Sequence, residues 1–292
     1  MYNFENCDVQ FNVPMKEYTT FKTGGVAKVL IEPKTPLAVA SVLKNLSSRG
    51  EKYYILGNGS NLLVSDEGID VPIIHIGKNL SEVRVDGESV ICQAGALLAS
   101  AAYTAYKNNL TGMEFAHGIP GSVGGGTCMN AGAYGGELKD IIDWIDYASP
   151  SGEVCRMDAD TASFSYRKSF FSDKDLVVTA VCFKLKNGVS EEILAKMKEL
   201  GEKRRSKQPL EYPSAGSTFK RPEGYFAAAL IEEANLKGVS VGGACVSEKH
   251  SGFVINKGNA TTNDILALME KIQKTVYDKS GVMLSPEVKV WK

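Results

Sequence analysis

The chain has 292 residues, of which 43% are hydrophobic and 23% are charged, and its formal net charge is −1. Because this length is long for one hydrophobic core, we expect a globular protein of two or three domains. The balanced charge, without a long cationic run, argues against a nucleic-acid partner.

The N-terminal segment 1–18 has neither a basic start nor an apolar core, so we expect no signal peptide. No segment approaches the roughly 18 consecutive apolar residues of a membrane span, so we expect no membrane partner. The six cysteines include no Cys-x-x-Cys pair and the three histidines are isolated. This pattern argues against a metal site and fits reduced thiols, which predicts a cytoplasmic protein.

Helices and strands are expected to alternate along the chain. Thr35 and Pro36 form an N-cap and first-turn pair, and the helix that they begin should end near Arg49 and Gly50. The other expected elements are strands at 53–56 and 62–64, a hairpin of 83–85 and 90–93 around Asp86-Gly87, a helix at 97–107, strands at 141–147, 154–157 and 177–186, a helix from Ser190, a helix near 225–234, a strand segment at 239–246 and an amphipathic helix with Ile265, Leu268, Met269, Ile272 and Val276. The mixture predicts an α+β chain with a boundary near Lys207.

Residues 112–136, GMEFAHGIPGSVGGGTCMNAGAYGG, form a segment in which nine of 25 residues are glycine. Glycine lets backbone N–H groups approach a ligand closely, and successive N–H groups can form an anion site. A flexible linker is the alternative interpretation, but linkers are polar throughout, whereas Phe115, Ile119 and Val123 interleave with these glycines. We therefore favour a phosphate or dinucleotide cradle in a packed, ordered loop.

A second glycine motif, Gly57-Asn58-Gly59-Ser60-Asn61-Leu62, follows the strand expected at 53–56. It begins like a dinucleotide fingerprint, but leucine stands where the third glycine should be, and the residues that follow predict strand instead of helix. A Rossmann site is therefore disfavoured, and the lack of Gly-Lys-Ser/Thr argues against a P-loop. Two glycine-rich loops about sixty residues apart still fit one extended ligand held from two sides, such as FAD.

Three polar residues stand in contexts that favour chemistry. Arg167 follows Ser165-Tyr166, Ser217 lies among small residues, and Glu287 lies in the last apolar stretch, where an unpaired carboxylate would be costly to bury. Each also has an ordinary explanation: a surface ion pair, a turn hydroxyl and a solvated edge residue. The residues alone leave both interpretations open for all three positions.

Seven motifs occur in order from residue 20 almost to the C-terminus. They are TFKTGGVA at 20–27, LGNGSNLLVSDEG at 56–68, GMEFAHGIPGSVGGG…MNAGAYGGE at 112–137, SYR at 165–167, PSAGSTFK at 213–220, VSEKHSGFVIN at 246–256 and SPEV at 285–288. Together they resemble the family of UDP-N-acetylenolpyruvoylglucosamine reductases, also called UDP-N-acetylmuramate dehydrogenases or the MurB family, of bacterial peptidoglycan synthesis. The chain has no extended tyrosine-bearing loop between Val178 and Ser190, which resembles the family's shorter type II subtype.

The resemblance implies an α+β architecture with an FAD-binding type-2 fold, like that of the PCMH and vanillyl-alcohol-oxidase proteins. Two FAD-binding subdomains are expected at 1–77 and 78–206, and an α+β substrate-binding domain at 207–283. This expectation allows the C-terminal tail 284–292 to return to the second subdomain.

The family's cofactor is FAD, which we expect to be bound non-covalently, with NADPH as the electron donor in the same cleft. In this sequence the matching positions lie in both glycine-rich loops. They are Gly57, Asn58, Gly59, Ser60, Asn61, Leu62, Ile119, Gly121, Ser122, Gly124, Gly125, Asn130, Gly132 and Ala133.

The resemblance also implies a reaction, in which reduced flavin delivers hydride to the enolpyruvyl methylene of UDP-N-acetylglucosamine enolpyruvate. Negative charge then develops on the adjacent carbon and its carboxylate. By position, Arg167 and Glu287 match the family's pair near this carboxylate, and Ser217 matches its proton donor. A guanidinium binds a carboxylate bidentately, whereas an ionised Glu287 would repel the charge and helps only when protonated or when it orients Arg167.

Four further residues are candidates for substrate binding: Arg204, Lys207, Lys220 and His250. The first two either contact phosphates or form the solvated end of a helix, and the histidine is either a substrate contact or structural. Two positions depart from the family. Gly126-Thr127 replaces a frequent Ala-Val, which should leave the loop intact, and Arg221 replaces a frequent Asn, which puts a substrate contact there in doubt.

Two other functions stay open. A flavin oxidase of the same fold would be reoxidised by oxygen and could tether flavin through His117 or Cys128, although the motif context does not support a tether. A non-catalytic nucleotide-binding relative is the other alternative, against which the joint presence of Arg167, Ser217 and Glu287 argues.

Overall fold

The computed structural model describes residues 2–292, which form two compact units, each with its own hydrophobic core. The first unit comprises the residues up to Phe11 together with Val29–Asn58 and Val71–Lys203. The second comprises Asn12–Lys28, Gly59–Asp70 and Arg204–Lys292. The subdomain boundaries after residues 77 and 206 stay a prediction. Met1, the first residue of the subdomain expected at 1–77, lies outside the described residues.

A mostly parallel sheet contributes to the first unit. Its strand order is β1 (Cys7–Pro14), β2 (Val26–Pro33), β5 (Ile73–His75) and β3 (Tyr54–Leu56), and β5 pairs in parallel with both β2 and β3. Helix α1 (Pro36–Ser48) connects β2 to β3. The Thr35 side chain accepts the N–H of Ala38 at 3.1 Å, which confirms the predicted cap.

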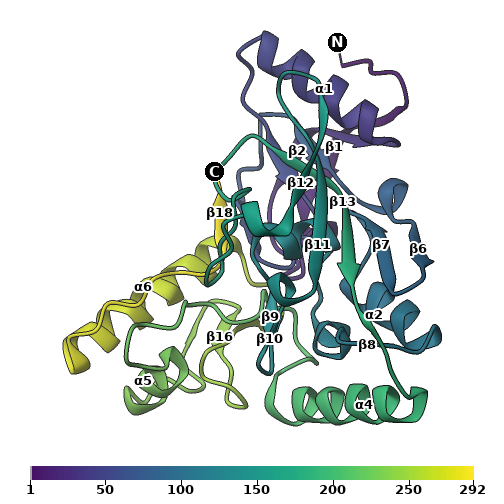
Figure 1. Cartoon of the computed structure of the whole chain (residues 1–292). Helices are drawn as coiled ribbons and strands as arrows, with labels where there is room; N and C mark the ends of the chain where they lie inside the picture. The colour runs from purple at the N-terminus through teal and green to yellow at the C-terminus, as the bar shows by residue number, and fades with distance from the viewer. Residues whose placement is uncertain (1) are drawn as a thin grey trace. The chain divides into compact units, whose positions relative to one another are not determined.

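The second sheet of the first unit is antiparallel. Figure 1 shows its strands side by side in the order β12 (Val154–Asp158), β11 (Ile142–Ala148), β13 (Val177–Lys184), β7 (Ser89–Gln93) and β6 (Val83–Asp86). The β6–β7 pairing confirms the predicted hairpin. Phe183 and Leu185 are buried and Lys184 and Lys186 are exposed, whereas 177–183 is buried almost throughout, because its side chains belong to the apolar core of the first unit.

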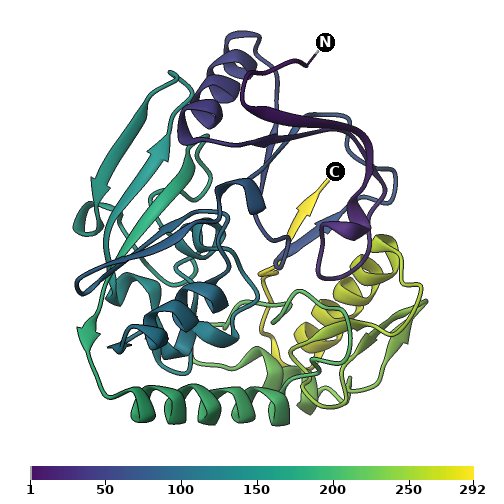
Figure 2. The same cartoon turned by 90° about the vertical axis from the view of Figure 1, so that its right-hand side faces the viewer.

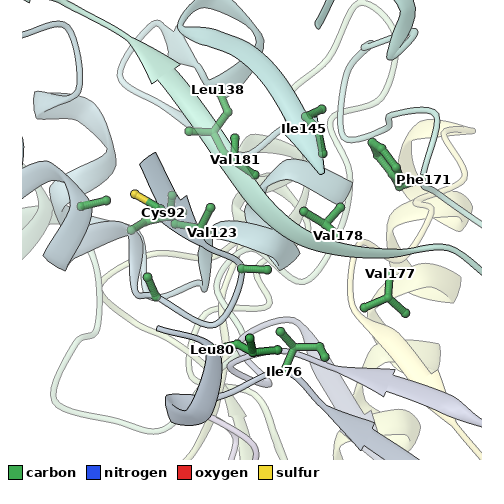
Figure 3. Packing of buried hydrophobic residues seen from close by; sticks show 14 of the residues in the cluster. Ile76, Leu80, Cys92, Val123, Leu138, Ile145, Phe171, Val177, Val178 and Val181 are labelled. Atoms are coloured by element: carbon green, nitrogen blue, oxygen red, sulfur yellow. The ribbon is translucent and has the colours of Figure 1, made fainter. Parts of the chain in front are cut away.

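Short helices complete the core of the first unit. Residues 112–136, expected as an ordered loop, contain helix α3, which packs with Cys92 of β7 and Val181 of β13 in one apolar cluster (Figure 3). The remaining elements of this part of the chain are α2 (Leu98–Lys107), α3 (Val123–Cys128), α4 (Ser190–Lys207, which continues into the second unit), β8 (Leu110–Thr111), β9 (Gly132–Ala133), β10 (Gly136–Glu137), β14 (Lys186–Asn187) and 3-10 helices at Lys78–Leu80, Glu114–Gly118, Leu138–Asp140 and Ala159–Thr161.

The second unit joins the end of the chain to an early segment. Strand β18 (Lys289–Trp291), the yellow terminal strand of Figure 2, pairs in parallel with β4 (Leu62–Val64). The other elements of this unit are α5 (Ala227–Glu233), α6 (Thr262–Ser280), β15 (Ser240–Val241), β16 (Ala244–Val246), β17 (Val254–Asn256) and a 3-10 helix at Met15–Glu17. The strand segment expected at 239–246 is a hairpin instead, because Gly242, at φ +52°, turns the chain between β15 and β16.

Helix α6 confirms the predicted amphipathic pattern, since all five of the apolar residues predicted to form its face are buried. Two carboxylates hold its first turn. Asp264 forms a capping box with Thr261, and the Asp66 carboxylate, from the loop after β4, accepts the N–H groups of Thr262 at 2.8 Å and Asn263 at 2.9 Å. Within residues 2–292, no helix is both long enough and apolar enough to cross a membrane.

We expect Asp66→Ala to destabilise the second unit by about 1–2 kcal/mol, because two N–H groups at the start of α6 lose their acceptor. The measurement is the free energy of unfolding in urea. Asp70→Ala is the matched control, because the Asp70 side chain is 82% exposed and its ion pair with exposed Lys28, at 2.9 Å, is worth little, so about 0.5 kcal/mol or less is expected. Equal losses for the two variants would contradict this role for Asp66.

Candidate active site

The two predicted glycine-rich loops meet within the first unit. Gly57 follows β3, and a Cβ at this position would lie 2.6 Å from Ser122 Oγ, the N-cap of α3. Asn58 Nδ2 donates a hydrogen bond to the Pro120 carbonyl at 2.6 Å. We call Gly57, Asn58, Ser122 and Gly125 the glycine cradle.

The three consecutive glycines of α3 have different surroundings. Gly124 donates its N–H to the Ala94 carbonyl at 2.8 Å, and a Cβ there would lie 2.8 Å from Ala94 Cβ. A Cβ at Gly126 would lie 2.9 Å from Leu98 Cδ1. Gly125 alone of the three is exposed. Protein packing therefore accounts for Gly124 and Gly126, and Gly125 offers the side-chain-free surface that a phosphate needs for close approach.

The second half of the Gly57–Leu62 motif lies in the second unit. Gly59 is buried at φ +60°, and a Cβ there would lie 1.9 Å from the Tyr18 carbonyl oxygen. Ser60 is half-buried and Leu62 is buried in β4. Asn61 Nδ2 donates to the main-chain carbonyl of Glu287 at 3.0 Å. The carbonyl of Gly59 accepts the N–H of Thr20 at 3.1 Å, so this loop is bonded to its own unit on two sides.

Asn130, predicted to contact the cofactor, is buried and uses its whole side chain within the protein. Its Nδ2 donates to Glu137 Oε2 at 3.0 Å and to the Ser165 carbonyl at 3.1 Å, and its Oδ1 accepts the N–H of Lys139 at 3.0 Å. The bond to Ser165 fastens the turn that carries Arg167.

Arg167 lies in a tight turn closed by two backbone hydrogen bonds between Ser165 and Lys168, at 2.9 and 3.2 Å. Its φ of +55° is unusual for a residue with a side chain. The residue is half-buried, and its Nη1 donates to the Gly132 carbonyl at 3.5 Å. The hydrogen bond from Lys139 lowers the pKa of Glu137, and the charge of Arg167 lowers it further.

The other cofactor positions belong to the same part of the first unit. Ile119 ends a 3-10 helix, and the Gly121 carbonyl accepts the N–H of Leu98 at 3.0 Å. Gly132 and Ala133 form β9, whose partner strand is β10. Ile119 and Gly121 lie beside the cradle along the chain, and the Gly132 carbonyl accepts a hydrogen bond from Arg167.

Ser217 and Glu287 come together within the second unit. Phe219 forms an antiparallel bridge with Pro286, and the N–H of Glu287 donates to the Thr218 carbonyl at 2.8 Å. Glu287 therefore stands opposite Thr218, one register position from Ser217. Ser217 is exposed and Glu287 is half-buried, so neither residue is sealed inside the core of this unit.

The predicted substrate residues are all in the second unit. Lys220 is exposed, and its N–H donates to the Ser285 carbonyl at 2.9 Å. Arg204 and Lys207 lie in the last turn of α4, where positive charge also complements the helix dipole. Burial lowers the pKa of His250, and its Nδ1 accepts the N–H of Gly252 at 3.1 Å, so the neutral ring carries its proton on Nε2.

A histidine–glutamate contact beside the cradle escaped the sequence analysis. His75 Nδ1 lies 2.8 Å from Glu32 Oε1, and His75 pairs in register with Leu56, the residue before Gly57. The partners are on different strands, and no local pattern marks them. Within residues 2–292, no group of three or more His, Cys, Asp or Glu side chains is placed to hold a metal ion.

Comparison with protein families defines the class. Residues 27–158 match the model of an FAD binding domain, and residues 208–291 match that of the UDP-N-acetylenolpyruvoylglucosamine reductase C-terminal domain. With the glycine cradle and the mixed sheets, these matches make the chain an FAD-dependent oxidoreductase with the predicted α+β, type-2 FAD-binding fold.

The particular family follows from whole-length relatives. UDP-N-acetylenolpyruvoylglucosamine reductases from Caldanaerobacter subterraneus and Clostridium tetani are each 48% identical, over 96% and 98% of this chain and 92% and 93% of their own lengths. The crystal structure of the Thermus caldophilus enzyme superposes with a TM-score of 0.84 at 34% identity, covering 98% of this chain and 99% of that one. The chain belongs to the UDP-N-acetylenolpyruvoylglucosamine reductase family, as the motifs predicted.

The contrast between Gly124 and Gly125 can be tested by two alanine variants. Gly124→Ala should lower the stability of the apoprotein by about 1–3 kcal/mol, because the new methyl group overpacks against Ala94. Gly125→Ala should leave the apoprotein at least nearly as stable as wild type, because alanine favours a helix, but should bind FAD more weakly. The measurements are thermal unfolding without flavin and flavin occupancy by absorbance. Full occupancy in Gly125→Ala would show that no ligand approaches there.

Proposed function

We propose that this chain uses NADPH and FAD to reduce UDP-N-acetylglucosamine enolpyruvate to UDP-N-acetylmuramate, a step of peptidoglycan precursor synthesis. The observation that carries the proposal is 48% identity, over 96% of the chain, to a protein named for this reductase activity. A cytoplasmic location and a role in cell shape and division follow from the proposed step. We assign FAD binding to 1–77 and 78–206 and substrate binding to 207–283.

Support for FAD binding at the cradle comes from Gly125, which is exposed and has no side chain to block the close approach of a phosphate. When bound, FAD supplies the hydride chemistry, taking hydride from NADPH and giving it to the enolpyruvyl methylene. Gly57, Asn58 and the other predicted cofactor positions are proposed to hold it. The side-chain amides of Asn61 and Asn130 donate hydrogen bonds within the protein, to Glu287 for Asn61 and to Glu137 and Ser165 for Asn130.

Arg167 is proposed to bind the substrate carboxylate. A planar guanidinium forms two parallel hydrogen bonds with a carboxylate, and these strengthen as negative charge accumulates during the reaction. Support comes from the turn around Arg167, which is held by Asn130 and by the Ser165–Lys168 bonds, so that the backbone beneath the guanidinium is fixed.

Ser217 Oγ is proposed to donate the proton that completes the reduction, because the carbon that gains negative charge is a strong base. Glu287, one register position away, is proposed to act in its protonated form, since an ionised carboxylate would repel the developing charge. Arg204, Lys207, Lys220 and His250 are proposed to bind the rest of the substrate. The two phosphates of a UDP-sugar favour such basic side chains.

One anaerobic spectroscopic experiment tests the function. The FAD-loaded protein is reduced with limiting NADPH and then mixed with UDP-N-acetylglucosamine enolpyruvate. We expect the oxidised flavin band to disappear with NADPH and to return with the sugar nucleotide. A protein that stays bleached until oxygen enters would be an oxidase, and one that cannot take up FAD would be a binding relative; either result would refute the proposal.

The proton-donor assignment is tested by Ser217→Ala. This variant should retain FAD and its reduction by NADPH, but its reoxidation by the sugar nucleotide should slow by about two to four orders of magnitude, the usual contribution of a placed general acid. Ser214→Ala, a serine-to-alanine change in the same PSAGS segment, is the control and should turn over at near the wild-type rate. Equal rates for the two variants would refute the assignment.

A further inference from the structure

The loop Gly59–Leu62 is bonded directly to the segment that carries Glu287 and, through Thr20, to the segment that carries Ser217. Asn61 Nδ2 donates to the Glu287 carbonyl at 3.0 Å, and the Asn61 carbonyl accepts the N–H of Lys289 at 3.1 Å. On the other side, the Thr20 hydroxyl donates to the Ser214 carbonyl at 2.6 Å, while the Thr20 N–H donates to Gly59. All these residues belong to the second unit.

Glu287 is held from two directions by its main chain. Its N–H donates to Thr218 at 2.8 Å and its carbonyl accepts from Asn61, so the peptide groups on both sides of its Cα are fixed. Thr218 is itself immobilised, because its N–H donates to the Gly252 carbonyl at 2.9 Å and its Oγ1 accepts the N–H of Val254 at 3.0 Å. The position of Glu287 relative to Ser217 therefore depends on Thr218 and Asn61.

The residue type at position 61 fits this task. Strand pairing between β4 and β18 begins at Leu62 and Lys289, so Glu287 lies just before the ladder. The side-chain amide of Asn61 supplies a donor there that the β4 backbone does not. A carboxylate of the same shape has no N–H and would place negative charge beside a carbonyl oxygen.

We propose that Asn61 is a positioning residue for Glu287, and through it for the proton-donating surface that includes Ser217. This inference rests on the proposed function and adds to the role predicted for Asn61 in the cofactor loop. It also means that the loop predicted to hold the cofactor and the residues predicted to complete the reduction share one hydrogen-bonded frame. Loss of the Asn61 amide should therefore affect the step that uses Glu287 more than the binding of flavin.

The test uses the FAD-loaded enzyme and separates its two half-reactions by stopped-flow absorbance. For Asn61→Ala and the isosteric Asn61→Asp, measured with FAD at saturation, we expect reoxidation by UDP-N-acetylglucosamine enolpyruvate to slow about tenfold more than reduction by NADPH does, the scale of one lost hydrogen bond. Asn263→Ala is the control, because Asn263 is an exposed asparagine of the same unit, and both of its half-reactions should match wild type.

A double-mutant cycle shows whether Asn61 acts through Glu287. Asn61→Ala combined with Glu287→Ala should be reoxidised no more slowly than Glu287→Ala alone, because the side chain being positioned is then absent. Fully additive losses would overturn the proposal. Loss of FAD, or equal slowing of both half-reactions, would overturn it in favour of a purely cofactor-binding or structural role.

Hydrogen exchange gives a readout that does not depend on activity. In Asn61→Ala the amides of Glu287 and Lys289 should exchange faster than in wild type, while those in the middle of α6 should be unchanged. Unchanged exchange at residues 284–290 would overturn the proposal. If wild type itself fails to react with NADPH or the sugar nucleotide, the proposed function fails, and the exchange result still decides whether Asn61 holds Glu287.

Discussion

The parallel pairing of β18 with β4 is the constraint on which the second unit depends. It fixes the last residues of the chain against residues 62–64, so that Ser65 donates to the Trp291 carbonyl at 2.9 Å and Lys289 donates to Asn61. The segment before β18 then runs beside Thr218 and Phe219, and Pro286 of this segment forms a bridge with Phe219. Glu287 thus takes its place from contacts between three segments distant in the sequence. None of the three segments would hold that position alone.

The three consecutive glycines of α3 serve both the packing of the helix and the proposed approach of a ligand. Three glycines in a short helix are unfavourable, by up to about 1 kcal/mol each relative to alanine. The cost is offset because the Cβ-free faces of Gly124 and Gly126 let α3 lie directly against Ala94 and Leu98, with Val123 in the core. The exposed face at Gly125 is then held by a rigid element instead of a mobile loop, as a binding surface requires.

Sequence patterns predicted those elements whose signals are local. The cap at Thr35, the Asp86-Gly87 hairpin and the apolar stripe of α6 are each specified within one or two turns of chain, and all three were confirmed. Three-residue strands such as β5 and β17 carry no usable periodicity, and β18 is defined by a partner more than 200 residues away. The motif resemblance supplied the family and candidate site residues, but not their bonding. The side-chain amides of Asn130 and Asn61 donate to the carbonyls of Ser165 and Glu287, respectively. These are tertiary contacts, which the residues on either side of each asparagine do not encode.

The backbone of Arg167 gives a physical argument for its importance that is independent of the resemblance. A left-handed conformation costs a residue with a Cβ roughly 1–2 kcal/mol, and glycine would adopt φ +55° without this cost. The turn nevertheless carries arginine, and the surroundings enforce the strained conformation through the Ser165–Lys168 bonds and Asn130. Strain that persists because the surroundings over-determine it is characteristic of functional sites. Glycine could not supply the contacts that the Arg167 side chain makes within the first unit, where Nη1 donates to the Gly132 carbonyl at 3.5 Å and the guanidinium lies 5.4 Å from the centre of the Tyr166 ring.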